Sequence, residues 1–418
     1  MFYERSELAN GVTVVTEHME GTRSVALGLW VRVGNRDETS TERGLSHLME
    51  HMLFKGTPTR SALDISAQMD ALGADMNAFT GRESTCFYAR VIDEHFAEAF
   101  DVLADMLVNA SFAPEELALE REVVIEEIAR SEDTPDDHIY DLFSDAIMPT
   151  NPLGRPVLGT RELVAGFDHD ALVTYHRRHY TTGNVFVVAC GNIEHDDVVR
   201  RAEAAFSGLP AGTRLVREHV AENAQRHLSV KTQDTEQAHV LYGFPSIARD
   251  SPERYAYALL DAIMGGSMSA RLFTEIREKR GLAYSVYTSQ QGYEDAGVFC
   301  MYAGTRPDNI AEVLSVARAQ FALMAESGPS EEELARACDM TCGHFVLGME
   351  STRSHMSRLG KAAVSGMPFL STEETLERYR AVSCADVARV AAHLFNEQAT
   401  IAIISPLGRD DIEGMLEA

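Results

Sequence analysis

Basic side chains are scarce in this sequence. It contains 37 lysines and arginines against 64 aspartates and glutamates, which gives a formal net charge of −27 at pH 7. Phosphate groups are bound mainly by lysine and arginine, so an acidic excess of this size excludes nucleic acid as a natural partner. The same charge would attract cationic peptides.

Long apolar runs and a cysteine framework are also missing. No stretch resembles a membrane span, and the first residues lack both the apolar run of a signal peptide and the Arg/Ser-rich composition of a transit peptide. The six cysteines lie scattered, which is typical of reduced thiols. Cys338, Cys342 and His344 could share a metal, but no second ligand pair accompanies them. We expect a cytoplasmic protein without a membrane segment.

The segment 44–54, Gly-Leu-Ser-His-Leu-Met-Glu-His-Met-Leu-Phe, holds the most informative pattern. On a helix, His47 and His51 lie one turn apart on one face, and Glu50 lies beside them. In the motif His-x-x-Glu-His, two neutral imidazoles hold a divalent ion and the glutamate reaches a water on that ion. Zinc is the predicted ion, because imidazole and carboxylate ligands with one open position suit it.

Coincidence is the alternative explanation of this motif, since the chain has 15 histidines and a core histidine needs only a hydrogen-bond partner. The surrounding residues argue against it. They give the helix an apolar body that would be largely buried: Leu45, Leu48, Met49, Met52 and Leu53. A histidine pair at helical spacing with an acid is harder to dismiss than a single core histidine.

A catalytic zinc usually has three protein ligands, so a carboxylate from another helix is expected. In a predicted helix over 114–130, one set of positions has the spacing of a face that turns toward a core: Glu120, Val123, Val124, Glu127 and Ile128. Taken alone, this is an ordinary amphipathic helix. Read with the two histidines, Glu127 is the candidate third ligand and Glu120 an acid that positions ligands or water.

These residues resemble the M16 metallopeptidases, the family of pitrilysin, insulin-degrading enzyme and the mitochondrial processing peptidase. In that family His-x-x-Glu-His is followed, after about seventy-five residues, by a liganding glutamate with another glutamate seven positions before it. The resemblance implies that His47, His51 and Glu127 bind one zinc per chain. It also implies that Glu50 is the general base, with Glu120 as a further catalytic residue.

The second half of the chain repeats the order of the first. Segment 238–244 matches 25–31, and 297–304 matches 84–90, but the second copy has no His-x-x-Glu-His. We predict an α+β protein with two homologous domains, each a mainly antiparallel sheet with helices packed on one face, like the LuxS/MPP-like metallohydrolases. Residues 1–210 form the predicted zinc-binding catalytic domain, 211–230 a linker, and 231–418 the domain without a metal site.

The resemblance further implies two regions that contact substrate. Arg277 and Tyr284 fall in a segment that reaches the substrate backbone in the family, where hydrogen-bond donors stabilise an oxyanion. Asn77, Ala78 and Phe79 fall on a strand that receives a peptide as an added strand. From the residues alone, Arg277 is a surface cation and 77–79 an ordinary strand.

The predicted function is that of a zinc endopeptidase that hydrolyses short or extended basic peptides inside a closed chamber. Some family relatives have lost the metal residues, so a noncatalytic or partner-dependent subunit of a processing-peptidase-like complex is the alternative. Five positions of the motif and its glutamates are intact here, which favours catalysis. The chain length resembles that of relatives that pair two chains, so a homodimer is expected.

Overall fold

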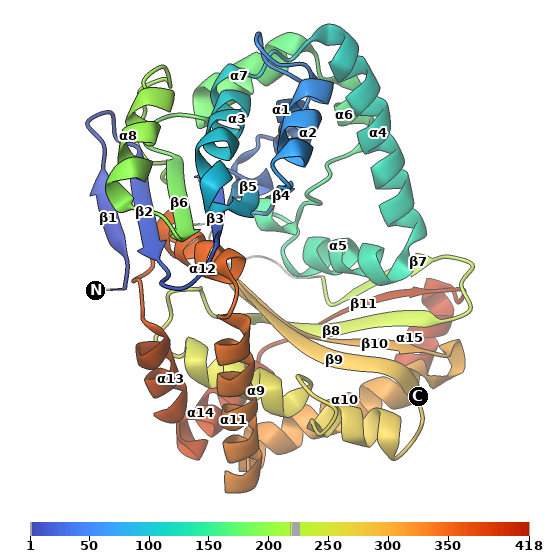
Figure 1. The fold of residues 1–418 in the computed structure, drawn as a ribbon. Helices are drawn as coiled ribbons and strands as arrows, with labels where there is room; N and C mark the ends of the chain where they lie inside the picture. The colour runs from blue at the N-terminus through green and yellow to red at the C-terminus, as the bar shows by residue number, and fades with distance from the viewer. Residues whose placement is uncertain (1, 218, 220–225, 418) are drawn as a thin grey trace. The chain divides into compact units, whose positions relative to one another are not determined.

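The computed structural model describes residues 2–217, 219 and 226–417, and the contacts divide the chain into two compact units (Figure 1). Unit 1 contains Met1–Ala129, Arg155–Glu218 and Gly348–Phe369, and unit 2 contains Arg130–Gly154, His219–Leu347 and Leu370–Ala418. The predicted linker, 211–230, lies partly outside the described residues. The predicted domain ranges 1–210 and 231–418 stay a prediction, and each compact unit draws segments from both ranges.

Unit 1 is built on a six-stranded sheet with the order β1-β2-β6-β3-β5-β4. Its strands are β1 (Glu4–Glu7), β2 (Thr13–His18), β3 (Ser24–Val31), β4 (Asp75–Thr80), β5 (Thr85–Ile92) and β6 (Val185–Gly191). Only β2 and β6 pair in parallel; the other neighbours are antiparallel. The strand β4 therefore forms one edge of this sheet.

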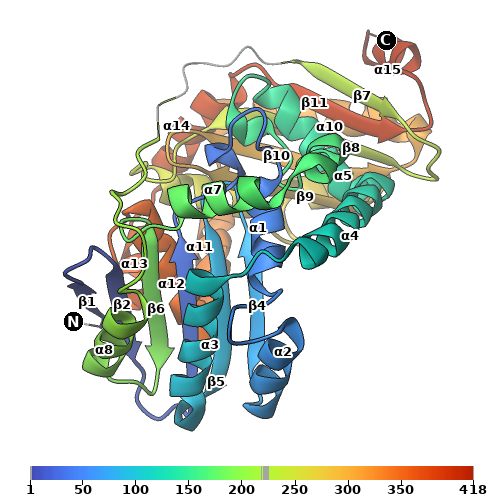
Figure 2. The same ribbon diagram turned by 90° about the horizontal axis from the view of Figure 1, so that it is seen from above.

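The helical elements of unit 1 follow its strands along the chain. They are η1 (Asn35–Asp37), α1 (Leu45–Leu53), α2 (Ala62–Ala71), η2 (Asp93–His95), α3 (Phe96–Asn109), α4 (Pro114–Asp133), α6 (Arg161–Gly166), α7 (His169–His179), α8 (His195–Ala205) and α12 (Thr352–Ser365). The contact division places the last residues of α4 in unit 2. Figure 2 shows α8, α3 and α2 on the same side of the strands, where their apolar residues join one core.

Both faces of the unit 1 sheet are covered. Alternate residues of β3 point to opposite faces, so Leu27 and Leu29 join the core under α1 and α3, whereas Ala26 and Trp30 join a second core under α12. A methyl group at Gly360 of α12 would collide with the Trp30 ring, so this helix lies directly on the sheet. Coverage on both faces explains why β3 is apolar almost throughout.

Unit 2 has a five-stranded sheet with the order β7-β11-β8-β10-β9. Its strands are β7 (Leu228–Thr232), β8 (Ala238–Ser246), β9 (Ala283–Gly292), β10 (Gly297–Thr305) and β11 (Thr400–Ser405). Only β7 and β11 pair in parallel. Its helical elements are α5 (Pro135–Ile147), η3 (Pro152–Gly154), α9 (Arg254–Met264), η4 (Phe273–Glu278), η5 (Pro307–Asn309), α10 (Ile310–Ser327), α11 (Glu331–Gly348), α13 (Thr372–Arg380), α14 (Cys384–Phe395) and α15 (Arg409–Glu417).

The predicted fold class is confirmed: the chain is α+β, with two units whose sheets are mainly antiparallel. In each unit most helices cover one face of the sheet, as expected. A single helix covers the other face, α12 in unit 1 and α5 in unit 2, and neither placement was predicted. Within the described part of the chain, no helix has the length and apolar character needed to cross a membrane.

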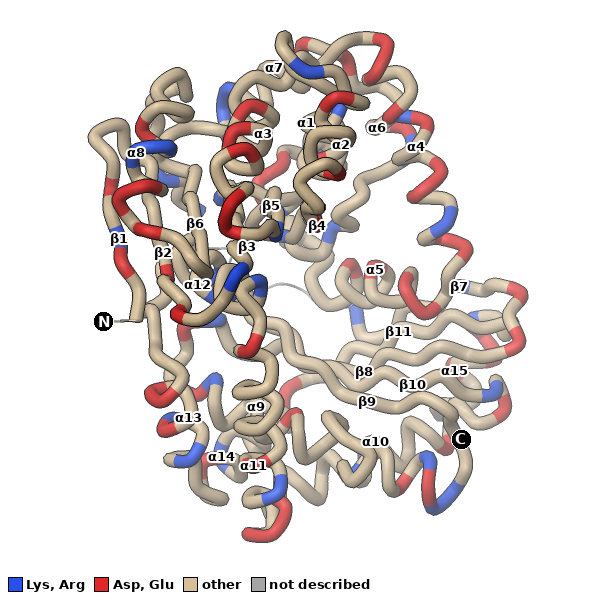
Figure 3. Tube along the Cα trace, viewed as in Figure 1, with Lys and Arg blue, Asp and Glu red and all other residues tan. Residues whose placement is uncertain are grey.

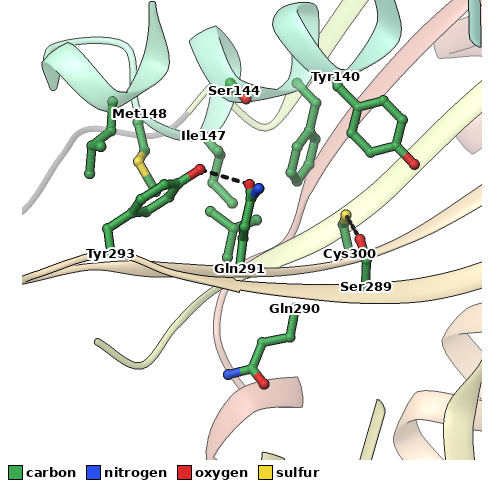
Figure 4. Close-up of a pocket in the computed structure, with 12 residues that line it drawn as sticks. Tyr140, Ser144, Ile147, Met148, Ser289, Gln290, Gln291, Tyr293 and Cys300 are labelled. Atoms are coloured by element: carbon green, nitrogen blue, oxygen red, sulfur yellow. Dashed lines mark hydrogen bonds between the residues drawn. The ribbon is translucent and has the colours of Figure 1, made fainter. Parts of the chain in front are cut away.

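Unit 2 contains a cavity of about 160 Å³ between α5 and the strands β9 and β10 (Figure 4). Ile147 and Met148 lie on the α5 side, and Ser289 and Cys300 lie on the strand side. On its polar rim, the Tyr293 hydroxyl donates a hydrogen bond of 2.7 Å to Gln291 Oε1. None of the predicted site residues lines this cavity.

Candidate metal centre

The helix α1 brings the two motif histidines into unit 1. It begins after Gly44, whose φ of 95° is a left-handed conformation that glycine adopts readily. The Glu38 carboxylate accepts hydrogen bonds from the backbone N–H groups of Gly44 (2.9 Å) and Ser46 (2.7 Å). These hydrogen bonds cap the N-terminus of α1. Five apolar residues anchor α1 in the core, namely Leu45, Leu48, Met49, Met52 and Leu53.

His47, His51 and Glu127 come together between α1 and α4. Glu127 Oε2 lies 3.6 Å from His47 Nε2 and 3.5 Å from His51 Nε2. One ligand atom from each of the three residues can be chosen so that all lie within 4.8 Å of one another, and no other group of three His, Cys, Asp or Glu side chains does so among the described residues. The structure therefore brings together the three predicted ligands.

The distances in this group fit a tetrahedral zinc ion. Ligand atoms about 2.0 to 2.1 Å from a tetrahedral zinc lie about 3.4 Å from each other. The two nitrogen–oxygen separations, 3.5 and 3.6 Å, are close to this value and too long for good hydrogen bonds. His47 Nδ1 is buried without a hydrogen-bond partner among the described residues. The other ring nitrogen of His47, Nε2, faces Glu127 and is the atom available to a metal.

The two histidines differ in their surroundings. Burial and the neighbouring His51 lower the pKa of His47 to about 4, which keeps its imidazole neutral, as ligation requires. For His51, burial lowers the pKa, but the neighbouring carboxylates of Glu127 and Glu120 outweigh it and the net shift is upward. A cation bound between His51 and Glu127 would replace that proton.

Glu120 supports His51 from the side opposite to Glu127. Its buried carboxylate lies with Oε2 3.0 Å from His51 Nδ1 and Oε1 2.5 Å from the Lys55 ammonium. A carboxylate at Nδ1 fixes the ring and its tautomer, so that Nε2 presents its lone pair. The structure thus places Glu120 beside a predicted ligand, and its role in catalysis stays a prediction.

Glu50 follows His47 by one helical turn and is mostly removed from water. Burial raises the pKa of its carboxyl group, while a hydrogen bond from Thr80 and the charge of His51 oppose the rise. The Thr80 hydroxyl donates to Glu50 Oε2 over 2.5 Å. A carboxyl group with a raised pKa beside a metal-binding group is suited to proton transfer near neutral pH.

The prediction for the face of α4 was partly wrong. Leu117, Glu120, Val124 and Ile128 are buried, but Val123, which was placed on the inward face, is 48% exposed. The buried stripe is narrower than the sequence spacing indicated, because only one side of the helix meets the core. Glu127 lies at the margin of that stripe, with a side chain 43% exposed.

Asn77, Ala78 and Phe79 lie on β4, the edge strand of the unit 1 sheet. Their exposure alternates: Asn77 and Phe79 are exposed, and Ala78 packs against the core. The Phe79 ring contacts the edge of Trp30 at a centroid distance of 5.5 Å. The strand is therefore an edge, as expected, while its contact with a peptide stays a prediction.

Arg277 and Tyr284 belong to unit 2, at η4 and the start of β9. Arg277 Nη1 donates to the Tyr284 carbonyl oxygen over 2.6 Å, and the guanidinium lies 4.6 Å from the centroid of the Tyr284 ring. Tyr284 is 73% exposed. The two residues form a pair, and their predicted approach to the metal centre stays a prediction.

Sequence reasoning missed three residues that support the site: Glu38, Lys55 and Thr80. Lys55 follows His51 by four positions, and Thr80 follows Ala78 by two, so helical and strand periodicity could have placed both near the motif. Glu38 had no such signal, because its contact with the start of α1 depends on the path of the loop between η1 and α1.

A two-unit α+β chain with one His-His-Glu group has the features of a metallohydrolase. Residues 13–161 match the family model described as "Insulinase (Peptidase family M16)", and residues 166–340 match "Peptidase M16 inactive domain". The two matches together cover most of the chain. The chain belongs to peptidase family M16.

Relatives that match along most of their length support this assignment. The chain is 41% identical to an uncharacterized zinc protease of Streptomyces coelicolor, over 96% of this chain and 89% of the relative. It is 38% identical to the uncharacterized zinc protease YmxG of Bacillus subtilis, over 97% of this chain and 98% of the relative.

Solved structures share the fold. A structure described as the peptidase M16 inactive domain from Pseudomonas fluorescens has a TM-score of 0.91 at 20% identity and covers 98% of this chain and 99% of its own. A protease from Helicobacter pylori has a TM-score of 0.90 at 20% identity, with coverage of 97% and 99%. At this identity the likeness is one of fold.

Proposed function

We propose that this protein is a zinc-dependent endopeptidase. The observation that carries the proposal is the convergence of His47, His51 and Glu127, with Glu50 on the same helix as both histidines. Relatives named zinc proteases support the choice of zinc. When bound by these three residues, zinc would supply a Lewis acid and lower the pKa of a water to about 7.

The protein's own residues would manage the protons. Glu50 accepts a proton from the attacking water and later returns it to the amine of the leaving fragment. Its raised pKa suits both steps, because the carboxylate must take up a proton and then release it. Glu120, held between Lys55 and His51, keeps the His51 ring in one orientation throughout.

Substrate binding would use the edge of unit 1. In this proposal an extended peptide pairs with β4 along Asn77, Ala78 and Phe79, and main-chain pairing accepts many sequences. Arg277 and Tyr284 would donate hydrogen bonds to the developing oxyanion or orient the peptide, inside a chamber closed to water. Removal of one such donor typically costs about 3 kcal/mol in the barrier.

We further propose that the substrates are basic peptides and that the active form is a cytoplasmic homodimer. Figure 3 shows acidic positions along α4 and, in unit 2, along α5. Near Glu127, α4 also carries the exposed Glu122 and Glu126. Lysine and arginine side chains of a peptide would be attracted to these carboxylates.

A noncatalytic, partner-dependent subunit is the second candidate. The description "inactive domain" applies to the match with residues 166–340, which contain none of the His47, His51 and Glu127 group. The match to residues 13–161 contains all three. The family descriptions are therefore compatible with catalysis by the first half of this chain.

The test is mass-spectrometric detection of fragments from a basic, presequence-like peptide incubated with the zinc-loaded protein. A Glu50→Gln variant is the control, because it should retain zinc and lose the base. Cleavage by the wild type alone, with zinc in both proteins, is the expected result. If neither protein cleaves this peptide or a panel of other extended peptides, the noncatalytic candidate replaces the proposal.

A further inference from the structure

The last residue of β4, Thr80, points toward α1, the helix that carries the His-x-x-Glu-His motif. Alternate side chains of β4 face the core on the α1 side, as Met76 and Ala78 do. The register therefore turns the Thr80 hydroxyl toward α1, where it donates a 2.5 Å hydrogen bond to Glu50 Oε2. Strand and helix are thus joined at the carboxylate that the proposed function uses as a base.

This contact limits the orientations of the Glu50 carboxylate. The terminal torsion of a glutamate is broad, so an unsupported carboxylate samples many orientations. With Oε2 bound by Thr80, the other oxygen, Oε1, is left to receive a proton. Among the described residues, Thr80 is the side chain whose hydrogen bond to this carboxylate the structure records.

We propose that Thr80 is a positioning residue for the general base, an inference that rests on the proposed function. Thr80 holds Oε2 so that Oε1 faces the attacking water. The proton leaves the water, bonds to Oε1 and later passes from Oε1 to the leaving amine, while Thr80 keeps its own proton. Since Thr80 also closes the edge strand, a peptide that pairs with β4 would lie next to the residue that orients the base.

Unit 2 offers a contact of similar form with no catalytic residue in it. Thr288 lies on the edge strand β9, and its hydroxyl donates to the backbone carbonyl oxygen of Asp261 in α9 over 3.1 Å. A threonine that joins an edge strand to a helix can therefore serve structure alone. This makes Thr288 the matched control, because its loss removes a strand-to-helix hydrogen bond without touching Glu50.

The experiment compares Thr80→Val, Thr80→Ser and Thr288→Val. Because a hydrogen bond to a charged group is stronger than a neutral one, Thr80→Val should lower kcat roughly 10- to 100-fold, with KM changed less than about twofold. Thr80→Ser, which keeps the hydroxyl, should restore most of kcat. Thr288→Val should leave kcat and KM unchanged. All variants should bind zinc as the wild type does, measured by competition with a chromophoric chelator.

A cycle with Glu50→Gln separates positioning from damage to the fold. If Thr80 acts through Glu50, Thr80→Val should have no further effect in the Glu50→Gln background, where cleavage is absent and the affinity for a small metal-binding acid is the readout. Three outcomes would overturn the inference. Thr80→Val could have equal effects in both backgrounds, Thr80→Ser could fail to restore kcat, or Thr80→Val could leave kcat unchanged.

A binding readout keeps the inference independent of peptide cleavage. Acetohydroxamic acid is a small probe with an acidic hydroxyl that needs a carboxylate acceptor beside the metal. Its Kd for the zinc-loaded protein should rise about tenfold in Thr80→Val, return in Thr80→Ser, and show no further rise when Thr80→Val is added to Glu50→Gln. This pattern in a protein that cleaves no peptide would reject the proposed function but not the role of Thr80. If the wild type cleaves peptide, and Thr80→Val changes neither kcat nor the Kd of the probe, the proposed function stands and the role of Thr80 is rejected.

Discussion

The sheets of units 1 and 2 share the order of five strands, but the helix that follows the central strand has different residues in each unit. The strands β2-β6-β3-β5-β4 and β7-β11-β8-β10-β9 follow one order, each with a single parallel pair at the corresponding place. A helix follows the central strand in both units: α1 after β3, and α9 after β8. One architecture therefore supports two helices whose residues can be compared directly.

The two helices differ in the side chains that they bury: α1 places polar residues at positions where α9 has apolar ones. On α1, His47 is buried and Glu50 is half-buried. The helix α9 instead buries a nearly continuous set of apolar side chains: Ala256, Tyr257, Leu259, Leu260, Ala262, Ile263 and Met264. Burying polar groups costs stability unless they are bonded. The comparison teaches that unit 1 accepts a loss of folding stability to hold polar side chains on α1, whereas the same place in unit 2 holds apolar core residues.

Removal of a ligand is the strongest test of this difference. His51→Ala should reduce bound zinc from one per chain to almost none and lower kcat/KM at least about 1,000-fold, because one of three protein ligands is lost. Zinc content by mass spectrometry and peptide cleavage provide the readouts. His344→Ala in unit 2 is the control and should leave one zinc per chain. If His344→Ala loses zinc and His51→Ala keeps it, the zinc site lies in unit 2, and the predicted ligands in unit 1 are wrong.

Loss of the Glu120 carboxylate should have the next largest effect. Glu120→Gln should weaken zinc binding about 10- to 100-fold, because a neutral amide replaces the charged carboxylate that orients the His51 ring and raises its basicity. The affinity is measured by chelator competition. A variant with unchanged affinity would show that the packing of α1 alone orients the ring.

The third test concerns how closely α12 packs on unit 1. Gly360→Ala should destabilise the protein by about 1 to 3 kcal/mol, because the added methyl group would collide with Trp30. Gly343→Ala is the matched change in α11 of unit 2, where an added methyl group meets nothing within 4 Å, and it should stabilise by up to about 1 kcal/mol. Denaturant titration measures both. Similar effects of the two changes would contradict the close packing of α12.

The last test concerns the start of the two helices. Burial raises the pKa of Glu38, which binds the first N–H groups of α1, to about 7; at the start of α9, Glu253 makes no side-chain cap. A carboxyl group whose pKa is raised on folding stabilises the protein below its unfolded pKa, near 4.5, and loses this contribution as the pH rises through 7.

The wild-type apoprotein should therefore lose about 2 kcal/mol more stability between pH 5 and pH 8 than Glu38→Gln, in which this proton uptake is absent. Thermal unfolding at a series of pH values checks the slope. Parallel curves for the two proteins would exclude Glu38 as a source of the pH dependence.

Local periodicity explains which parts of the site were predictable. His47, Glu50 and His51 lie within three turns of one helix, so their spacing in the sequence determines their geometry once the helix forms. Glu127 lies on a second helix. The spacing of that helix, read with the two histidines, made Glu127 a candidate ligand, and the resemblance to a family implied the same role. Val123 was misplaced because the width of a buried face depends on what packs against it.

The sequence by itself determined the elements, the α+β class, the repeat and the His-His-Glu set, because these depend on periodicity and on residue chemistry over short stretches. Only the tertiary structure decided that Lys55 meets Glu120, that Thr80 meets Glu50, and that α12 and α5 cover the second faces of the sheets. Such contacts join residues far apart in the chain. They depend on strand register and on how large surfaces are buried, which no single stretch encodes.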